Sequence, residues 1–397
     1  MARNRTRAGI GIVGAGFLAE TRARCYARAG GGIVAVVDLV EEVAGRFASR
    51  HGISKVCGDL EEMLARDDVD AVDLCVPNFL HRPMAEQAAR AGKHVICTKP
   101  LTAYVGQYLE EGSADSEISS VDRATMLAVA TADARAMTDA ARRGGVRLMY
   151  GENWIYSPSI VRARRLLAAS RGPILEMRGW ESHSGSHSPF AKLWRHSGGG
   201  ALLRLASHPI GAMLHLKREE GLAKAGKPIR PVAVSAEVAD LSAVERLDQG
   251  AAFVATGWKD VENWGCAVIS FEDGSRGVAF GSDNMLGGME SRLEVLSADS
   301  HLKCNLSPNN LLQAYAPSDE VFGEQYIMEK THTSAGWSTP MPDEDWTSGH
   351  QAMCEDFLSS LAEDRPPVSD GELGAEVVRV VYAAYLAASE GRRVALD

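Results

Sequence analysis

Two side chains in the stretch "GGGALLRLASHPIG" (198–211) are spaced so that they could act together, Arg204 and His208. The run after the glycines is expected to be helical, and residues four apart lie on one face of a helix. A guanidinium beside an imidazole suits a substrate, or a developing oxyanion, that carries negative charge. Pro209 lacks a backbone N–H, which predicts a kink or an early break near His208.

A lysine follows the apolar run "KHVICT" and directly precedes a proline, as Lys99-Pro100. A lysine at the end of a buried strand is poorly explained by packing. Such an amine could transfer a proton at a reacting oxygen. The alternative is that Lys99 only neutralises a phosphate or orients a loop.

A third candidate element is the turn "GAGFLA" (14–19), which follows an apolar run at 10–13 and precedes a helix. The first glycine permits a tight turn, the second lets a pyrophosphate approach the backbone, and the small third residue, Ala19, lets the helix pack closely. The residues expected to contact a dinucleotide here are Gly14, Ala15, Gly16, Phe17 and Leu18.

An acidic residue ends the second apolar run, "GIVAVVD", at Asp38, 22 residues after Gly16. A carboxylate there accepts hydrogen bonds from the ribose hydroxyls and repels a 2′-phosphate. No arginine follows it, since Leu39 and Val40 come next. The pattern favours NAD over NADP, with a simple strand-end turn as the alternative role of Asp38.

The elements that position these residues alternate along the first 150 residues. Apolar strands are expected near 10–13, 32–38, 54–57, 71–77, 93–98 and 146–152, with amphipathic helices between most of them, which is typical of a parallel sheet covered on both faces. Ligands bind outside the carboxyl ends of such strands. The residues expected in this cofactor crevice are Val76, Pro77, Asn78, His81, Thr98, Lys99 and Pro100, although His81 could instead be a surface helix cap.

The overall composition and charge limit the classes of protein to which this chain could belong. The 397 residues are 45% hydrophobic and 24% charged, and the net charge is −10, so we expect a soluble two-domain protein that binds no nucleic acid. The seven cysteines contain no CxxC pair, which points to a reducing, cytoplasmic compartment. We expect no signal peptide and no membrane-spanning segment.

The stretch "CVPNFLHRPMAEQAARAGKHVICTKPL" (75–101), with the glycine turn, resembles the glucose–fructose oxidoreductase/inositol dehydrogenase/MocA family. Further likeness lies in "GGGALLRLASHP" and in the tail "GELGAEVVRVVYAAYLAASEGRRVAL". The resemblance implies an α/β Rossmann domain with a doubly wound parallel sheet, placed at 1–150. It also implies an α+β domain at 151–397, whose large open, mainly antiparallel sheet often forms the interface of a homodimer or homotetramer.

The family resemblance also implies hydride transfer between NAD(P) and a hydroxyl carbon of a sugar, cyclitol or sugar acid. The lysine role at the reacting oxygen falls on Lys99, and an acid–base or substrate-binding role falls on His208. The chain departs from the family pattern where Thr98 replaces a glutamate, Arg204 and Gly211 replace aspartates, and Ile155 replaces an arginine.

These departures make the predicted substrate site basic. We expect an acidic or highly hydroxylated substrate, bound by Arg204, Arg195, Trp194, Asn153 and His183. The alternative pairs Arg204 with a buried acid, Glu152 or Glu181, for structural reasons alone. Among His183, His187 and His196, the first two are four residues apart, but Gly185 and the serines argue against a helix. No HExxH motif or carboxylate triad is present, so no metal is expected.

Two further segments carry expectations. Residues 102–124 exceed the usual family length and are interpreted as an insertion, a solvated loop rather than a lid. The last helices, near 351–363 and 371–390, are expected to close the second domain.

The leading hypothesis is an NAD-dependent dehydrogenase. The alternatives are an NAD-retaining glycoside-cleaving or epimerising enzyme, and a non-catalytic nucleotide-bound sensor.

Overall fold

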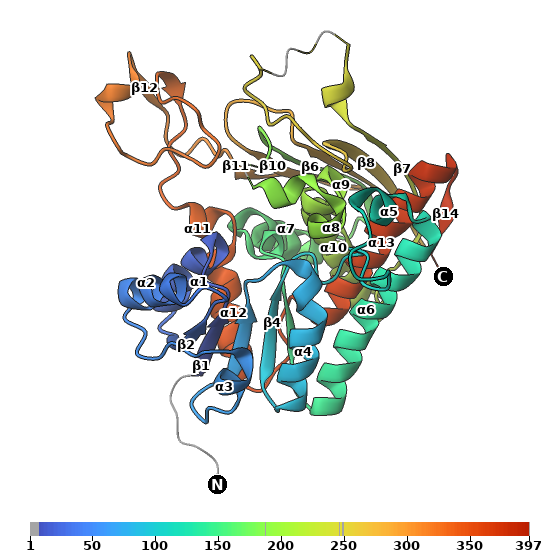
Figure 1. The fold of residues 1–397 in the computed structure, drawn as a ribbon. Coiled ribbons are helices and arrows are strands. Elements are labelled where there is room, and N and C mark those ends of the chain that lie inside the picture. The colour runs from blue at the N-terminus through green and yellow to red at the C-terminus, as the bar shows by residue number, and fades with distance from the viewer. Residues whose placement is uncertain (1–7, 187, 246, 248–249, 397) are drawn as a thin grey trace. The chain divides into compact units, whose positions relative to one another are not determined.

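The computed structural model describes residues 8–186, 188–245, 247 and 250–396, which form two compact units (Figure 1). Unit 1 takes the chain up to Ala103, then Val129–Tyr156 and Gly349–Val378. Unit 2 takes Tyr104–Ala128, Ser157–Ser348 and the chain from Arg379 onward. The units are therefore built from separate segments, unlike the contiguous division at residue 150 expected from the sequence.

Unit 1 contains a five-stranded sheet in the order β2-β1-β3-β4-β5, and every pairing is parallel. Its strands are almost wholly apolar because both faces are buried. The order reverses beside β1, which creates the switch point at which such sheets bind ligands. The strands are β1 (Gly9–Val13), β2 (Gly32–Val37), β3 (Ala71–Leu74), β4 (His94–Thr98) and β5 (Leu148–Gly151).

The helices of unit 1 come from both ends of the chain, and α12 contacts α1. This overturns the expectation that the helix near 351–363 closes the second domain. Helices α6 and α13 each contribute residues to both units. The helical elements are α1 (Phe17–Arg28), α2 (Glu41–His51), α3 (Leu60–Leu64), η1 (Asn78–Leu80), α4 (His81–Arg90), α6 (Arg123–Gly144), η2 (Trp154–Tyr156), α12 (His350–Ala362) and α13 (Gly371–Glu390).

A buried ion pair explains why α12 packs into unit 1. The Arg22 side chain is 1% exposed, and its Nε lies 3.4 Å from a carboxylate oxygen of Asp73, which is 0% exposed. Tyr26 donates its hydroxyl to the same carboxylate at 2.7 Å. One Nη of Arg22 reaches the sulfurs of Met353 and Cys354 in α12, at 3.7 and 4.0 Å. We name Arg22 and Asp73 the sealed pair.

Unit 2 contains a seven-stranded sheet in the order β11-β10-β6-β9-β8-β7-β14, in which only β6 and β9 pair in parallel. The expected open, mainly antiparallel sheet is confirmed. The strands are β6 (Ile174–Ser182), β7 (Pro231–Ala239), β8 (Trp264–Phe271), β9 (Arg276–Ser282), β10 (Glu290–Ser297), β11 (His301–Ser307) and β14 (Val394–Ala395); β12 (Ala314–Ala316) and β13 (Gly336–Ser338) form a separate hairpin.

Helices α7 (Pro158–Ala169), α9 (Ala201–Arg204) and α10 (Ser207–Ala225) pack against this sheet (Figure 1). Glycine allows close approach, since a Cβ on Gly179 of β6 would lie 2.4 Å from the Pro209 side chain. The remaining helical turns are α5 (Asp115–Ser120), η3 (Pro189–Lys192), α8 (Trp194–Ser197), η4 (Leu241–Ala243), η5 (Asp319–Val321) and α11 (Glu344–Thr347).

The helix expected after the three glycines is interrupted, because α9 ends at Arg204 and α10 begins at Ser207. The amide of His208 donates to the carbonyl of Leu205 at 3.1 Å. That carbonyl lies four residues before Pro209, which has no N–H to offer it. The expected break is confirmed, but Arg204 and His208 belong to different helices, so the prediction of one shared helix face is wrong.

The segment at 102–124 is packed only in part: residues 102–105 and Ile118 are buried, whereas residues 107–112 and 114–117 are exposed, as expected of a solvated loop. Tyr104 is 2% exposed; its amide donates to the Tyr382 hydroxyl at 2.6 Å and its carbonyl accepts from the Trp194 indole at 3.0 Å. Ile118 of α5 is also buried and packs against Gly106. In the described part of the chain, no helix is long and apolar enough to cross a membrane.

Candidate functional site

The glycine turn of unit 1 joins the ends of three strands. Gly14 has φ +87° and donates its amide to Val37 at 2.8 Å, and a Cβ there would lie 2.6 Å from the carbonyl oxygen of Cys75. Gly16 precedes α1 without a capping side chain, and nothing lies within 4 Å of a Cβ built on it. The first-turn amides of α1 are therefore accessible to an anion, as a pyrophosphate requires.

Asp38 lies at the end of β2 and is tied to this turn. One carboxylate oxygen accepts the Ala15 amide at 2.8 Å, and the other accepts the Val40 amide at 3.0 Å. Each oxygen keeps a lone pair for a ribose hydroxyl. The same bonds stabilise the strand-end turn, so both roles considered for Asp38 fit the geometry.

The crevice residues follow β3 and β4, which are neighbours in the sheet. Val76 and Asn78 after β3, and Thr98, Lys99 and Pro100 at the end of β4, are all half-buried, whereas Pro77 is exposed. The carboxyl ends of adjacent parallel strands thus bring these segments together, as the sequence predicts.

His81 differs from the other crevice residues, because its side chain is buried. It is 1% exposed; Nδ1 lies 3.0 and 3.2 Å from the carbonyl oxygens of Pro100 and Leu101, and Nε2 lies 3.0 Å from that of Val76. Burial lowers the pKa of this imidazole, although the three carbonyls oppose the shift. A surface helix cap and a side chain that contacts a cofactor would both be exposed, whereas the His81 ring is buried against backbone carbonyls.

The three glycines of unit 2 surround a buried carboxylate. Glu262 accepts the amides of Gly200 and Leu202 at 3.0 and 2.9 Å and the hydroxyl of Tyr385 at 2.7 Å. A Cβ on Gly200 would lie 1.8 Å from the Glu262 carbonyl oxygen, and one on Gly199 would lie 2.4 Å from the Tyr385 hydroxyl. Burial raises the pKa of Glu262. Sequence reasoning missed this carboxylate, for which the glycine run was the available signal.

Arg204 lies beside Asp283, whose carboxylate is 0% exposed. One guanidinium nitrogen lies 3.4 Å from Oδ1 of Asp283, and another bonds Oδ2. The guanidinium also lies over the Trp258 ring, 5.1 Å from its centroid, while the side chain stays 15% exposed. A buried acid does pair with Arg204, and this acid is Asp283. We name Arg204 and Asp283 the open pair.

His183 lies on the other side of Asp283. Its Nδ1 is 3.6 Å from Oδ1 of that carboxylate and accepts the Gly185 amide at 2.9 Å. A ring nitrogen that accepts a hydrogen bond carries no proton, so Nε2 carries the N–H of a neutral ring. In this tautomer His183 carries its proton on Nε2, in a nearly buried position.

The remaining predicted residues have mixed surroundings. His208 is 8% exposed in the first turn of α10, and Asn153 is 7% exposed two residues after β5. Trp194 is 2% exposed, with its ring 5.2 Å from that of Tyr385, and Arg195 bonds Asp115 at 2.5 Å. These contacts give Trp194 and Arg195 structural roles; their substrate contacts remain predictions, and His187 lies outside the described residues.

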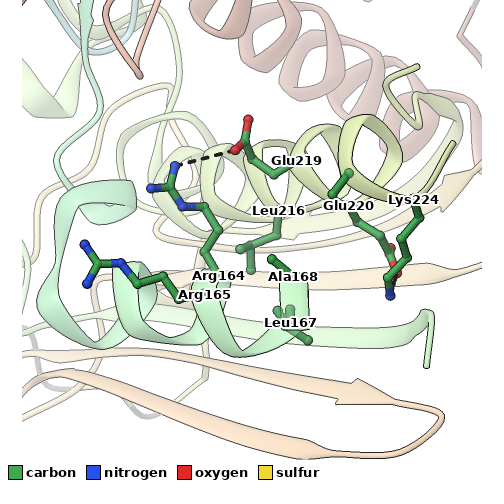
Figure 2. A pocket seen from close by; sticks show the side chains of 9 residues that line it. Arg164, Arg165, Leu167, Ala168, Leu216, Glu219, Glu220 and Lys224 are labelled. Carbon is green, nitrogen blue, oxygen red and sulfur yellow. Dashed lines mark hydrogen bonds and ion pairs between the residues drawn. The ribbon is translucent and has the colours of Figure 1, made fainter. Parts of the chain in front are cut away.

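A groove between α7 and α10 is separate from the open pair (Figure 2). It encloses about 140 Å³ between apolar side chains such as Leu167 and Leu216 and the charged Arg164 and Lys224. Leu216 lies eight residues beyond His208 along α10, which is roughly 12 Å of helix. Across the described residues, no cluster of three His, Cys, Asp or Glu side chains could hold a metal ion.

Comparison with known proteins defines the class. Residues 8–112 match the model of the oxidoreductase family NAD-binding Rossmann fold, and residues 180–396 match that of the oxidoreductase family C-terminal alpha/beta domain. The two matched regions are those of a two-domain, dinucleotide-binding oxidoreductase. The chain belongs to the glucose–fructose oxidoreductase/inositol dehydrogenase/MocA family.

Characterised relatives share parts of the chain. Levoglucosan dehydrogenase of Pseudarthrobacter phenanthrenivorans is 27% identical over 225 residues, 53% of this chain and 51% of that protein. The 1,5-anhydro-D-fructose reductase of Ensifer adhaerens is 28% identical over 57% of this chain and 59% of that protein. The matched regions therefore span little more than half the length of these relatives.

Solved structures extend the likeness to the whole fold. GenD2 from gentamicin A biosynthesis, in complex with NAD, has a TM-score of 0.79 at 27% identity and covers 100% of this chain and 98% of its own. Levoglucosan dehydrogenase in complex with NADH and L-sorbose has a TM-score of 0.72 at 21% identity, covering 98% and 99%.

Proposed function

We propose that the chain is an NAD-dependent dehydrogenase that transfers a hydride between nicotinamide and a hydroxyl-bearing carbon of a sugar, cyclitol or sugar acid. The observation that carries this proposal is the dinucleotide half-site of unit 1. An open helix N-terminus at Gly16 and a carboxylate at Asp38, tied to the Ala15 amide, fit a pyrophosphate and an adenosine ribose. The names of the relatives as sugar dehydrogenases and reductases support the same reaction class.

The chain's own residues supply the proton chemistry. Nicotinamide, when bound, accepts or donates the hydride. Lys99, at the carboxyl end of β4, takes the proton of the reacting hydroxyl during oxidation and returns it during reduction. His208, in unit 2, is proposed as an acid–base or binding group for the substrate.

The open pair sharpens the substrate class. The Asp283 carboxylate offsets the charge of Arg204, yet the guanidinium keeps a solvent-reachable edge. We propose that this edge and the Nε2–H of His183 donate hydrogen bonds to substrate hydroxyls. An uncharged polyhydroxylated substrate therefore fits the open pair and His183 better than a carboxylated one.

We further propose NAD rather than NADP, because the Asp38 carboxylate would repel a 2′-phosphate.

We also propose that the protein is cytoplasmic and forms a homodimer or homotetramer. All seven cysteines are free thiols, which fits a reducing compartment. On the sheet of unit 2, the Trp180 and Phe280 rings stack 5.8 Å apart on neighbouring strands, which fits an interface between copies.

The test measures NADH formation with aldoses, cyclitols, aldonates and uronates, comparing wild type with Lys99→Met. Lys55→Met is the matched control, because Lys55 pairs with Glu62 on α3 and is outside the crevice. We expect turnover of an uncharged sugar or cyclitol, lost in Lys99→Met and kept in the control, with an unchanged dissociation constant for NAD. Equal activity of Lys99→Met and wild type would refute the assignment of Lys99.

A further inference from the structure

The loops that carry the proposed site are not tied together by the sheet. The pairing of β3 with β4 stops at Leu74 and Cys97, and Thr98 pairs only with Gly151 on the other side. Beyond these residues the chain continues as Val76-Pro77-Asn78 on one side and Lys99-Pro100-Leu101 on the other. Another contact must fix one segment against the other if Lys99 is to keep a set position.

The His81 imidazole makes that contact. Its two nitrogens lie on carbonyl oxygens of both segments, 3.0 Å from Pro100, 3.2 Å from Leu101 and 3.0 Å from Val76. The ring is 1% exposed, and it is held at the first residue of α4. Since Pro100 directly follows Lys99, this ring supports the backbone next to the amine.

A neutral imidazole has a single N–H, so it cannot donate to both segments at once. Nδ1 lies near two carbonyl oxygens of the Lys99 segment, whereas Nε2 lies near one of the other segment. The N–H is therefore best used on Nδ1. We propose that His81 is a positioning residue, which donates from Nδ1 to the Pro100–Leu101 carbonyls and thereby fixes the Lys99 amine for proton transfer. This assignment rests on the proposed dehydrogenase function.

Two substitutions separate positioning from packing. The amide nitrogen of asparagine takes the place of Nδ1, and that of glutamine takes the place of Nε2. His81→Asn should therefore keep the bond to the Lys99 segment. His81→Gln should lose that bond and donate instead to the Val76 carbonyl, which accepts no hydrogen bond from the Nδ1–H tautomer of wild type. We expect kcat to stay within about threefold of wild type in His81→Asn and to fall roughly tenfold to a hundredfold in His81→Gln, because a misplaced catalytic group loses that much rate.

Controls distinguish the two roles. KM, the dissociation constant for NAD and the loss in Tm should be similar in the two variants, since each amide can donate to a carbonyl of one segment. Equal loss of kcat in both variants, in proportion to Tm, would overturn the proposal, because a purely structural ring has no preferred side.

A measurement that needs no turnover keeps this test separate from the proposed function. The ¹³C-methylated Lys99 amine, identified by its absence in Lys99→Arg, should keep its NMR shift in His81→Asn and move in His81→Gln. In wild type, ¹⁵N shifts should show the proton on Nδ1 of His81. A proton on Nε2, or identical Lys99 shifts in both variants, would overturn the proposal even if hydride transfer is confirmed; absence of turnover with these results intact would refute only the reaction.

Discussion

Each unit contains an arginine–aspartate pair, and the two pairs differ in access to water. In the sealed pair of unit 1, both side chains are at most 1% exposed, and the guanidinium faces sulfur atoms besides its carboxylate. In the open pair of unit 2, the carboxylate is equally buried, but the guanidinium is 15% exposed and lies over an aromatic ring. The first guanidinium can contact only protein, whereas the second can also contact a ligand.

The difference shows that an arginine–aspartate pair can have a structural role or a ligand-contacting role, depending on its access to water. A buried ion pair adds little net stability, yet removal of one partner is costly because the other charge stays desolvated. Where water is excluded, the pair therefore specifies packing, here of α12 against α1. Where one edge is open, the same chemistry presents oriented hydrogen-bond donors with their charge offset.

The largest effect is expected from breaking the sealed pair. Arg22→Met leaves the Asp73 carboxylate buried without its cation, which should lower the free energy of unfolding by about 3–5 kcal/mol at pH 8. Desolvation then raises the pKa of Asp73 in the folded state, so the loss should shrink as pH falls and the carboxyl group is protonated. Chemical denaturation at several pH values measures both effects.

The control for this variant is Arg22→Met combined with Asp73→Asn. The amide is neutral and still accepts from the Tyr26 hydroxyl, so most of the lost stability should return. If the double variant is as unstable as the single one, lost packing rather than an uncompensated charge explains the effect.

The same substitution in the open pair should have a smaller effect on stability and a larger one on turnover. We expect Arg204→Met to lower the free energy of unfolding by about 2 kcal/mol, since water can reach the vacated edge. Loss of a charge-assisted contact to substrate should lower kcat/KM roughly tenfold to a hundredfold, with NAD binding unchanged. Unchanged kcat/KM for every accepted substrate would show that the open pair is as purely structural as the sealed one.

A buried basic group with no acid beside it provides a third case. His215 in α10 is 2% exposed, and burial, with Arg164 and Arg218 nearby, lowers its pKa to about 3. Because the folded pKa lies below the unfolded value near 6.5, the unfolded chain binds the extra proton, and stability falls as pH drops from about 6.5 toward 3. At pH 5 this amounts to about 2 kcal/mol.

Replacement of this side chain isolates the effect of the proton. His215→Leu should lose less stability than wild type between pH 7 and pH 5, as followed by thermal unfolding at each pH. The same acid sensitivity in both proteins would assign the effect to other groups.

The smallest effect is expected for Arg195, whose side chain is 34% exposed and pairs with the 47% exposed Asp115. Surface pairs contribute about 0–1 kcal/mol. Arg195→Ala should therefore change stability by less than about 1 kcal/mol and leave KM unchanged. A raised KM with unchanged stability would instead support the substrate contact predicted from the sequence.

Local patterns in the sequence predicted much of unit 1. The glycine turn, Asp38 and the alternating apolar strands each depend on neighbours close in the chain, and the parallel sheet with its open helix N-terminus agrees with them. The break before His208 was also predictable, because Pro209 acts on a carbonyl four residues away.

Distant partners were not predictable in the same way. No periodicity indicates that Asp283 would meet Arg204, or that Glu262 would accept the amides of Gly200 and Leu202. The helix at 350–362 has the pattern of any amphipathic helix. Its contact with α1 brings the sulfur of Met353 to Arg22, a residue 331 positions away in sequence, and no local pattern indicates that contact.

The order in which unit 1 is assembled has a consequence for synthesis. The strands of its sheet are translated before α12, which contacts α1 and follows it in the chain by more than 300 residues. Until α12 is made, a ribosome-bound chain exposes the apolar side of α1, and Arg22 lacks its contacts to Met353 and Cys354. Chaperone protection during translation should therefore matter more for this protein than for one whose first domain is contiguous.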